Sequence, residues 1–374
     1  MSHSTFLIAI DTGGTFTDCI AVDNADKIYT CKVLSNSSLR GKIEQWIDEM
    51  TFIIKHNWHV EKDIFINYEF KILNTPLNKF AIKSDDITSK FYVKHYDFVQ
   101  KIITLNKPLP FNLLNQNVSF EITANEEAPI LAARLITQTA LDEDFPPLLM
   151  RLGSTKGTNA LLERKGAPTA FFVTKGFMDL LKIGNQQRPN LFALQIIKPE
   201  PLYTEGVEVT ERLNADGSVL IPISKELIAN DLDKIILKLK KKKIQSVAVA
   251  LMHAYRNPAH ELMLKEYLKK HFDYVSVSSE LSQQIKFVPR AQTTVVNAYL
   301  APIIDNYIGN IMRQLPDNSL RVMTSAGSLV HASFFQPKDS LLSGPAGGIV
   351  GAVTIGKMLM METGKLFIRI NVFE

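Results

Sequence analysis

The chain has 374 residues, a length that predicts two or three domains at roughly 150 residues per domain. Its 46% hydrophobic and 21% charged residues lie near the globular average and exclude wholesale disorder. A formal net charge of +4 is too small for the electrostatic footprint of a dedicated nucleic-acid-binding protein. We therefore expect a globular protein without a nucleic-acid partner.

Cys19 and Cys31 are the two cysteines of the chain. Two are too few for a disulfide framework, and no Cys/His cluster has zinc-site spacing. The apolar run 6–10 is short, follows no basic residue and ends at Asp11, which favours a first strand over a signal peptide. No stretch reaches the roughly 18–20 apolar residues that span a bilayer. We expect a soluble, cytoplasmic protein in a reducing compartment, with no membrane partner.

The first third of the chain reads mainly as strands. Residues 5–34 alternate apolar runs with tight turns and predict three antiparallel strands, because parallel crossovers need longer connections. In residues 40–57, Ile43, Trp46, Ile47 and Met50 fall at helical spacing and predict a helix. Between about 60 and 125, β-branched and aromatic runs predict a small all-β insertion, a barrel or sandwich at the surface. Its aromatic residues are expected to form its core rather than a nucleic-acid surface.

From residue 128 the pattern changes to alternating helices and strands. Residues 128–139 predict a helix, and 148–184 predict a strand, a helix over 156–165 and a buried strand over 169–174. A hairpin is expected at 216–217, then a helix over 225–243 capped by Ser224, with Lys240 to Lys243 as its solvated end. A long helix over 292–315 and a glycine-led helix from about 345 follow. This alternation predicts an α/β layer with a largely parallel sheet.

The sharpest local motif is DTGGTFTD at 11–18, placed between two predicted strands. Glycines let backbone N–H groups approach a phosphate closely, yet neither the Walker loop nor the dinucleotide fingerprint is present. Thr15 and Thr17 could donate hydroxyl hydrogen bonds to phosphate, and Asp11 and Asp18 could hold Mg²⁺ as hard oxygen ligands. A tight hairpin without a ligand accounts for the same composition.

Four blocks together resemble the hydantoinase A / 5-oxoprolinase family: IAIDTGGTFTD at 8–18, the block 152–189, VALMHAYRNPAHE at 249–261 and LLSGPAGGIVGA at 341–352. The resemblance implies an α/β fold of ribonuclease H-like, actin-like ATPase lobes, a mixed sheet with helices, carrying the small all-β insertion. It divides the chain into an N-terminal domain at 1–222 and a truncated core domain at 223–374. The resemblance is weakest over the all-β insertion.

The resemblance also implies a function, the N-terminal part of an ATP-dependent cyclic-amide hydrolase that resembles 5-oxoprolinase and converts 5-oxo-L-proline to L-glutamate. ATP and Mg²⁺ would be cofactors, a small cyclic amide the substrate, and a hydantoinase B-type subunit the partner. An N-methylhydantoinase, an acetone-carboxylase-type subunit and a non-catalytic truncated remnant or interaction module remain alternatives.

The family's functional residues carry over to the matching positions of this sequence. Asp11 would organise metal and water, and Asp18 would join it as a metal ligand. The residues implied to face the nucleotide are glycines and threonines: Gly13, Gly14, Thr15, Thr17, Gly344, Gly347 and Gly348. Thr155 and Asn159 would face the reactive centre.

Other polar residues have no clear assignment from the sequence. Arg188, beside Gln186 and Gln187, could clamp a carboxylate or lie in a surface loop. His253 and His260 lack metal-ligand spacing, so His260 and Glu261 are expected to serve a structural, capping role.

The sequence departs from the family after the SGPAGG residues, where relatives carry a second DxGGT-type loop on the next strand. Here residues 361–374 read METGKLFIRINVFE, of which 365–373 predict a strand without such a loop. We therefore expect a truncated chain with weak or absent Mg-ATP binding on its own.

Overall fold

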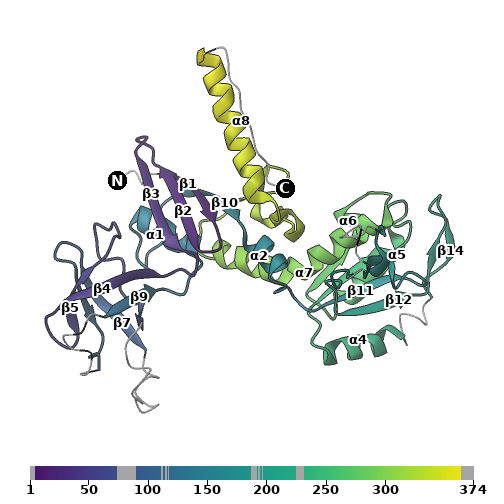
Figure 1. Cartoon of the computed structure of the whole chain (residues 1–374), viewed down its shortest axis with the longest axis horizontal. Helices are drawn as coiled ribbons and strands as arrows, with labels where there is room; N and C mark the ends of the chain where they lie inside the picture. The colour runs from purple at the N-terminus through teal and green to yellow at the C-terminus, as the bar shows by residue number, and fades with distance from the viewer. Residues whose placement is uncertain are drawn as a thin grey trace. The chain divides into compact units, whose positions relative to one another are not determined.

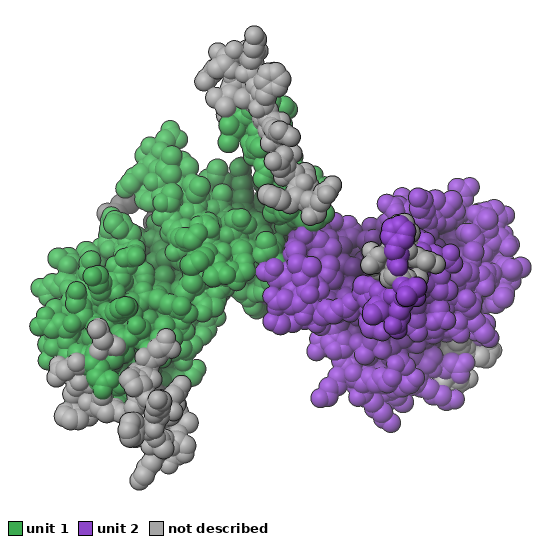
Figure 2. Space-filling model, viewed as in Figure 1, with its two compact units in different colours: residues 1–156, 307–335, 342–374 green, residues 157–306, 336–341 purple. Residues whose placement is uncertain are grey.

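A computed structural model describes residues 5–73, 90–110, 113, 116, 118–186, 192, 194–195, 197–224 and 231–363. The chain divides into two compact units (Figure 2). Unit 1 comprises Met1–Lys156, Tyr307–Phe335 and Leu342–Glu374, and unit 2 comprises Gly157–Asn306 and Gln336–Leu341. These units follow contacts in space, so they differ from the consecutive domains 1–222 and 223–374, which stay a prediction.

Unit 1 contains a six-stranded mixed sheet in the order β18-β17-β10-β1-β2-β3. The predicted antiparallel meander is confirmed as β1 (Phe6–Thr12), β2 (Phe16–Val22) and β3 (Ile28–Leu34). β10 (Leu148–Ser154) runs parallel to β1, and β17 (Leu320–Met323) runs parallel to β10. β18 (Leu329–His331) is an edge strand and pairs with β17 in antiparallel orientation. Helix α1 (Ala128–Thr137) packs on β1, β2 and β3.

A closed barrel of six strands forms the second part of unit 1 (Figure 1). Its strands are β4 (Leu39–Trp46), β5 (Thr51–Lys55), β6 (Glu69–Leu73), β7 (Phe91–Asp97), β8 (Ile102–Leu105) and β9 (Ser119–Thr123). The predicted all-β module is therefore present, but it begins near residue 39 rather than 60. Stacked rings of Phe70 and Phe120, 4.7 Å apart, lie in its core as expected.

The helix predicted over 40–57 is wrong, because these residues form β4, β5 and the turn between them. Asp48 makes that turn, with its Oδ1 accepting from the backbone N of Met50 and of Thr51, each at 2.7 Å. Ile43 is buried in the barrel while Ile47 is 53% exposed, so the apolar residues do not share one helical face. Pairing with β8 and β9, which are far away in the sequence, makes this segment two strands rather than a helix.

Unit 2 is built on a parallel four-stranded sheet in the order β12-β11-β15-β16. The strands are β11 (Thr169–Thr174), β12 (Glu205–Val209), β15 (Ser246–Ala250) and β16 (Tyr274–Val277). Every residue of β11 and β15 is buried, as expected for a parallel sheet covered on both faces. The expected hairpin at 216–217 joins β13 (Arg212–Leu213) to β14 (Val219–Ile221).

Helices cover both faces of this sheet. Helices α4 (Leu232–Lys241) and α5 (Ala259–Leu268) pack on the face that presents Phe172 and Val249. The opposite face, with Phe171 and Ala248, packs against α7 (Phe287–Met312), whose residues up to Asn306 belong to unit 2. The shorter helices are α2 (Lys156–Leu162), α3 (Leu180–Ile183) and α6 (Ser278–Leu281), with 3-10 turns at Ala332–Phe334 and Pro337–Ser340.

Helix boundaries differ from the predictions mainly at their ends. α4 begins at Leu232 within the helix expected over 225–243, of which 225–230 lie outside the described residues. The glycine-led helix is α8 (Ser343–Thr363), and the strand expected over 365–373 lies outside the described residues. Within the described ranges, no helix has both the length and the apolar character that a membrane span requires.

Candidate functional site

The carboxyl ends of three parallel strands of unit 1 lie at one edge of the six-stranded sheet. Asp11 and Thr12 at the end of β1 pair with Gly153 and Ser154 at the end of β10. β17 runs in the same direction beside β10, so the turn after Met323 reaches the same edge. In α/β sheets, ligands bind in the crevice outside the carboxyl ends of the strands. The polar groups at this edge are therefore the candidates for binding a ligand.

The glycine turn between β1 and β2 is held by backbone and side-chain hydrogen bonds. The N–H of Gly13 donates to the carbonyl oxygen of Phe16 at 2.9 Å, and a Cβ at Gly13 would lie 3.1 Å from that oxygen. The Ser35 hydroxyl donates to the carbonyl oxygen of Gly13 at 2.8 Å, and the Ser35 N–H to that of Thr15 at 2.9 Å. The turn is therefore tight and braced from behind, with Gly14 and Thr15 exposed.

Thr17 differs from the role that the resemblance implies, because its side chain is fully buried. Its hydroxyl lies 3.1 Å from the hydroxyl of Ser35, so it braces the turn rather than facing solvent. Ser35 itself was missed by the sequence analysis. The Ser-rich run 35–38 after the third strand signals a turn, but nothing local shows that it contacts Gly13.

Asp11 and Asp18 lie directly opposite each other on β1 and β2, so both carboxylates are on the exposed face of the sheet. Asp18 is paired with Lys32, whose Nζ lies 2.8 Å from Oδ1 and 3.1 Å from Oδ2. Beside Asp11, the absence of a side chain at Gly153 leaves space, since a Cβ there would lie 3.4 Å from the Asp11 Oδ1. The two carboxylates named as possible metal ligands are therefore neighbours, and their metal role stays a prediction. The pairing of Asp18 with Lys32 became visible only in the sheet.

Thr155 and Tyr307 position the end of β1. The carbonyl oxygen of Thr12 accepts from the N–H of Thr155 at 2.9 Å and from its hydroxyl at 3.3 Å. The Tyr307 hydroxyl donates to the Thr12 hydroxyl at 3.3 Å, and burial raises the pKa of Tyr307 to about 12, so it stays protonated. The Nζ of Lys156 lies 4.1 Å from the centroid of the Tyr307 ring. Thr155 thus lies beside the end of β1 that leads into the glycine turn, and its role at a reactive centre stays a prediction.

The start of α8 reaches the same edge. The Ser343 hydroxyl donates to the carbonyl oxygen of Ser154 at 3.1 Å, and the N–H of Leu342 donates to the hydroxyl of Ser325 at 3.0 Å. Gly327, with φ +78°, makes a tight turn against α8, where a Cβ would lie 2.9 Å from a Val350 methyl group. Ser325 and Gly327 were also missed, although the Ser-Ala-Gly-Ser sequence at 325–328 is a usable turn signal.

The three glycines of α8 that the resemblance assigns to the nucleotide have different surroundings. A Cβ at Gly344 or Gly348 would meet nothing within 4 Å, whereas one at Gly347 would lie 3.7 Å from Met323 of β17. Gly347 therefore packs α8 against the sheet, and Gly344 leaves the start of the helix open. Backbone N–H groups at a helix start favour anions.

Asn159 lies on α2 in unit 2, whereas the residues above belong to unit 1. Beside it, the Thr158 hydroxyl donates to the carbonyl oxygen of Leu341 at 2.7 Å. The predicted role of Asn159 at a reactive centre stays a prediction. Gln187 and Arg188 lie outside the described residues.

Unit 2 buries a polar network at the carboxyl edge of its own sheet. The Nδ1 of His260 lies 2.7 Å from the Oε2 of Glu211. The other carboxylate oxygen of Glu211, Oε1, accepts a hydrogen bond from the Thr174 hydroxyl. Glu261 is fully buried and accepts from the N–H of Leu251 and of Ser279, each at 2.8 Å. Burial raises the pKa of Glu261, and these hydrogen bonds oppose the rise. The contacts fit the structural role expected for His260 and Glu261.

Among the described residues, no group of three or more His, Cys, Asp or Glu side chains is arranged to hold a metal ion. A cation at Asp11 and Asp18 would therefore complete its coordination with water or ligand oxygens, as Mg²⁺ commonly does.

Comparison with solved structures identifies the fold of the chain. Over 96% of this chain and 41% of the other, the fold matches nucleotide-free acetone carboxylase with a TM-score of 0.60 and 17% identity. The match to the ATP-dependent caprolactamase of Pseudomonas jessenii covers 94% and 40%, with a TM-score of 0.55 and 20% identity. The chain therefore shares the fold of these two enzymes, and its mixed α/β class is the one that the sequence predicted.

Sequence comparison identifies the family. Residues 7–61 and 115–272 match the profile described as hydantoinase/oxoprolinase N-terminal region, and 290–366 match the profile described as hydantoinase/oxoprolinase. The chain belongs to the hydantoinase/oxoprolinase family. Three of the six barrel strands, β6, β7 and β8, fall between the two matched segments of the first profile.

The alignments with curated relatives cover roughly half of this chain. The 5-oxoprolinase 1 of Arabidopsis thaliana is 40% identical over 222 residues, which cover 54% of this chain and 18% of the relative. The 5-oxoprolinase of Dictyostelium discoideum is 41% identical over 228 residues, with the same two coverages. Caprolactamase subunit alpha of P. jessenii is 29% identical over 165 residues, or 42% and 23%. The aligned part therefore spans about a fifth of each relative's length.

Proposed function

We propose that this chain is the N-terminal part of an ATP-dependent cyclic-amide hydrolase that converts 5-oxo-L-proline to L-glutamate. The relatives named 5-oxoprolinase support the substrate, and a relative named caprolactamase supports the wider class of cyclic amides. The observation that carries the proposal is the meeting of the glycine turn, the Asp11 carboxylate and the start of α8 at one sheet edge.

The edge fits a nucleotide's phosphates. Gly14 and Thr15 expose backbone and hydroxyl donors, and Gly13 gives the turn its tightness, because a side chain there would crowd the Phe16 carbonyl. Gly344 and Gly348 leave open space beside the start of α8, and Gly347 lies next to Met323 of β17. Thr17 contributes from behind the turn, through Ser35.

Two carboxylates fit Mg²⁺ at the same edge. Asp11 and Asp18 supply hard oxygen donors on one face, and like charges opposite each other repel unless a cation lies near them. Lys32 already neutralises Asp18, so Asp11 is the carboxylate that orders metal and water.

ATP, when bound, supplies a phosphoryl group that turns the amide oxygen into a better leaving group. Positioning and electrostatics dominate such transfers, which is the work we assign to the edge residues and to Thr155 and Asn159 near the reactive centre. A hydantoinase B-type subunit would take part in hydrolysis, and the designation "subunit alpha" of the caprolactamase relative supports a multi-subunit assembly.

Saturation-transfer NMR with millimolar Mg-ATP tests nucleotide binding by the purified chain. We expect transfer to the adenine protons, its loss in Asp11→Asn and its retention in Asp144→Asn, an exposed loop carboxylate of the same unit. The catalytic assignment is tested by 5-oxoproline-dependent ATP hydrolysis with the B-type subunit added. Absence of transfer in the unmodified chain, or equal transfer in both variants, would refute the site.

A further inference from the structure

The two cysteines of the chain lie directly opposite each other on neighbouring antiparallel strands, Cys19 on β2 and Cys31 on β3. Backbone hydrogen bonds join Ser35 to Thr15 and Asp23 to Lys27, four residues to either side of the pair. Because such positions alternate along an antiparallel ladder, Cys19 and Cys31 also form a hydrogen-bonded pair, with Cα atoms about 5.5 Å apart. That spacing lies within the roughly 4.4–6.8 Å range of disulfides.

Both thiols point to the same face of the hairpin, toward α1. The Sγ of Cys31 lies 3.7 Å from the carbonyl oxygen of Ala132, and Cys19 is only 2% exposed. The structure holds both as free thiols. Directly opposite residues on one face of an antiparallel pair have Cβ atoms about 4.5–5.5 Å apart, so the two strands need only a small local approach to close the disulfide.

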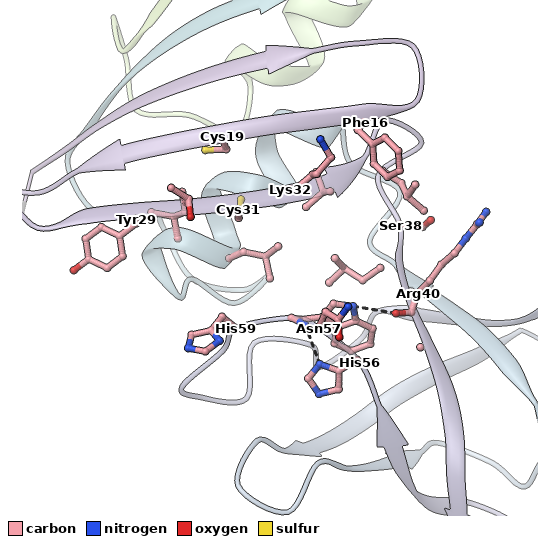
Figure 3. Close-up of a pocket in the computed structure, with 18 of the residues that line it drawn as sticks. Phe16, Cys19, Tyr29, Cys31, Lys32, Ser38, Arg40, His56, Asn57 and His59 are labelled. Atoms are coloured by element: carbon pink, nitrogen blue, oxygen red, sulfur yellow. Dashed lines mark hydrogen bonds between the residues drawn. The ribbon is translucent and has the colours of Figure 1, made fainter.

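The pair can be reached from solvent. A pocket of about 2070 Å³ in unit 1 is lined by both cysteines, by the end of α1 at Gln138 and by the segment from His56 to Trp58 (Figure 3). Cys31 lies on β3, the edge strand of the sheet, and is half-buried, whereas Cys19 lies behind it. This volume exceeds that of ordinary small-molecule sites, so a tripeptide disulfide can approach Cys31.

We propose that Cys19 and Cys31 form a reversible intrachain disulfide through exchange with a low-molecular-weight disulfide such as oxidised glutathione. Cys31 is the attacking residue because it is the accessible one. The neighbouring Cys31 thiol, together with burial, raises the pKa of Cys19, so Cys19 keeps its proton until the second step.

The exchange balances in two steps. The Cys31 thiolate, having lost its proton to water, attacks one sulfur of glutathione disulfide, forming a mixed disulfide and releasing one glutathione thiolate. Cys19 then loses its proton and attacks the Cys31 sulfur, which breaks the mixed disulfide and releases the second glutathione thiolate. Two protein thiols are oxidised and one glutathione disulfide is reduced to two glutathione thiols.

The disulfide would lie beside the glycine turn. Cys19 follows Thr17 by two residues, and Ser35, which braces the turn, follows Cys31 by four. Oxidation therefore ties together the two strands that hold Thr17 and Ser35. Reversible disulfides of this kind serve redox sensing where most thiols stay reduced.

Redox titration of the full chain tests the proposal. The reduced protein is equilibrated without oxygen at graded ratios of reduced to oxidised glutathione, acid-quenched, alkylated under denaturing conditions and weighed by intact mass spectrometry. We expect a monomer that loses two hydrogen masses and both alkylation sites as the ratio falls. Retention of two alkylatable thiols at every ratio, or a disulfide-linked dimer, would overturn the proposal.

Two serine variants separate the steps. Cys19→Ser should accumulate a stable glutathione adduct on Cys31, whereas Cys31→Ser should react with oxidised glutathione at least about 100-fold more slowly, because Cys19 is buried. Equal adduct formation in both variants would contradict the assigned order. Phenylarsine oxide, which bridges adjacent thiols, provides a check that needs no variant, since it should bind the reduced chain one to one. Failure to bind would show that the thiols do not adjoin.

Discussion

Replacing Glu261 by glutamine should destabilise unit 2 severely, although the side chain keeps its size. Its carboxylate is fully buried and accepts from two backbone N–H groups at 2.8 Å and from the Ser278 hydroxyl at 2.6 Å. The Nη1 of Arg290, itself buried, lies 3.7 Å from the Oε1 of Glu261. The amide nitrogen of glutamine would face the N–H of Ser279, and the charge opposite Arg290 would disappear.

The expected cost follows from these contacts. Removing one partner of a buried ion pair costs about 3–5 kcal/mol, because the other charge stays buried without compensation. Glutamine retains some of the hydrogen bonds, so we expect about 3 kcal/mol, which lowers the melting temperature by roughly 6–12 °C in a domain of this size. Arg290→Met should show a loss of similar size. The double variant should lose less than the sum by at least about 1 kcal/mol, because neither charge is then left alone.

Urea denaturation followed by circular dichroism measures these changes at pH 7. Glu266→Gln, an exposed glutamate on the same helix, is the matched control and should stay within about 0.5 kcal/mol of the unmodified chain. The reasoning is refuted if Glu261→Gln matches this control, or if the losses from Glu261→Gln and Arg290→Met simply add.

Three further substitutions test other parts of the structure. Gly166→Ala should cost about 1–3 kcal/mol in chemical denaturation, because its Cβ would lie 2.0 Å from the buried Tyr299 ring; an unchanged midpoint would show that the ring moves freely. Burial, with a smaller effect of Lys101, lowers the pKa of His56 to about 4 from 6.5. Stability that His56 provides above pH 6.5 should therefore be lost as the pH falls toward 4, and a His56→Phe variant should lose less over that range. Thr17→Val should cost about 1 kcal/mol by removing its hydrogen bond to the serine behind the glycine turn, with a neutral result in thermal unfolding as the contrary outcome.

Local sequence patterns predicted the segments whose structure depends on their own residues. The apolar runs and tight turns of 5–34 predicted the β1–β3 meander, and the uninterrupted apolar run at β11 predicted a buried strand. The motif at 11–18 placed Asp11 and Asp18 close together, because a short turn forces the residues on either side to pair across the hairpin.

Contacts between distant segments could not be derived in the same way. Residues 40–57 carry helical spacing, yet pairing with β8 and β9, more than 45 residues away in sequence, makes them strands of a closed barrel. Thr17 carries a hydroxyl suited to a phosphate, yet its strand position turns it inward onto Ser35.

The sequence by itself determined the family and the fold class, because its motifs and turn residues act over a few neighbouring positions. Only the tertiary structure decided that Ser325 and Gly327 join the start of α8 to the sheet edge, and that the two cysteines face each other. Strand register and helix packing minimise the free energy of the whole unit, so side chains far apart in the chain meet at positions that no local pattern encodes.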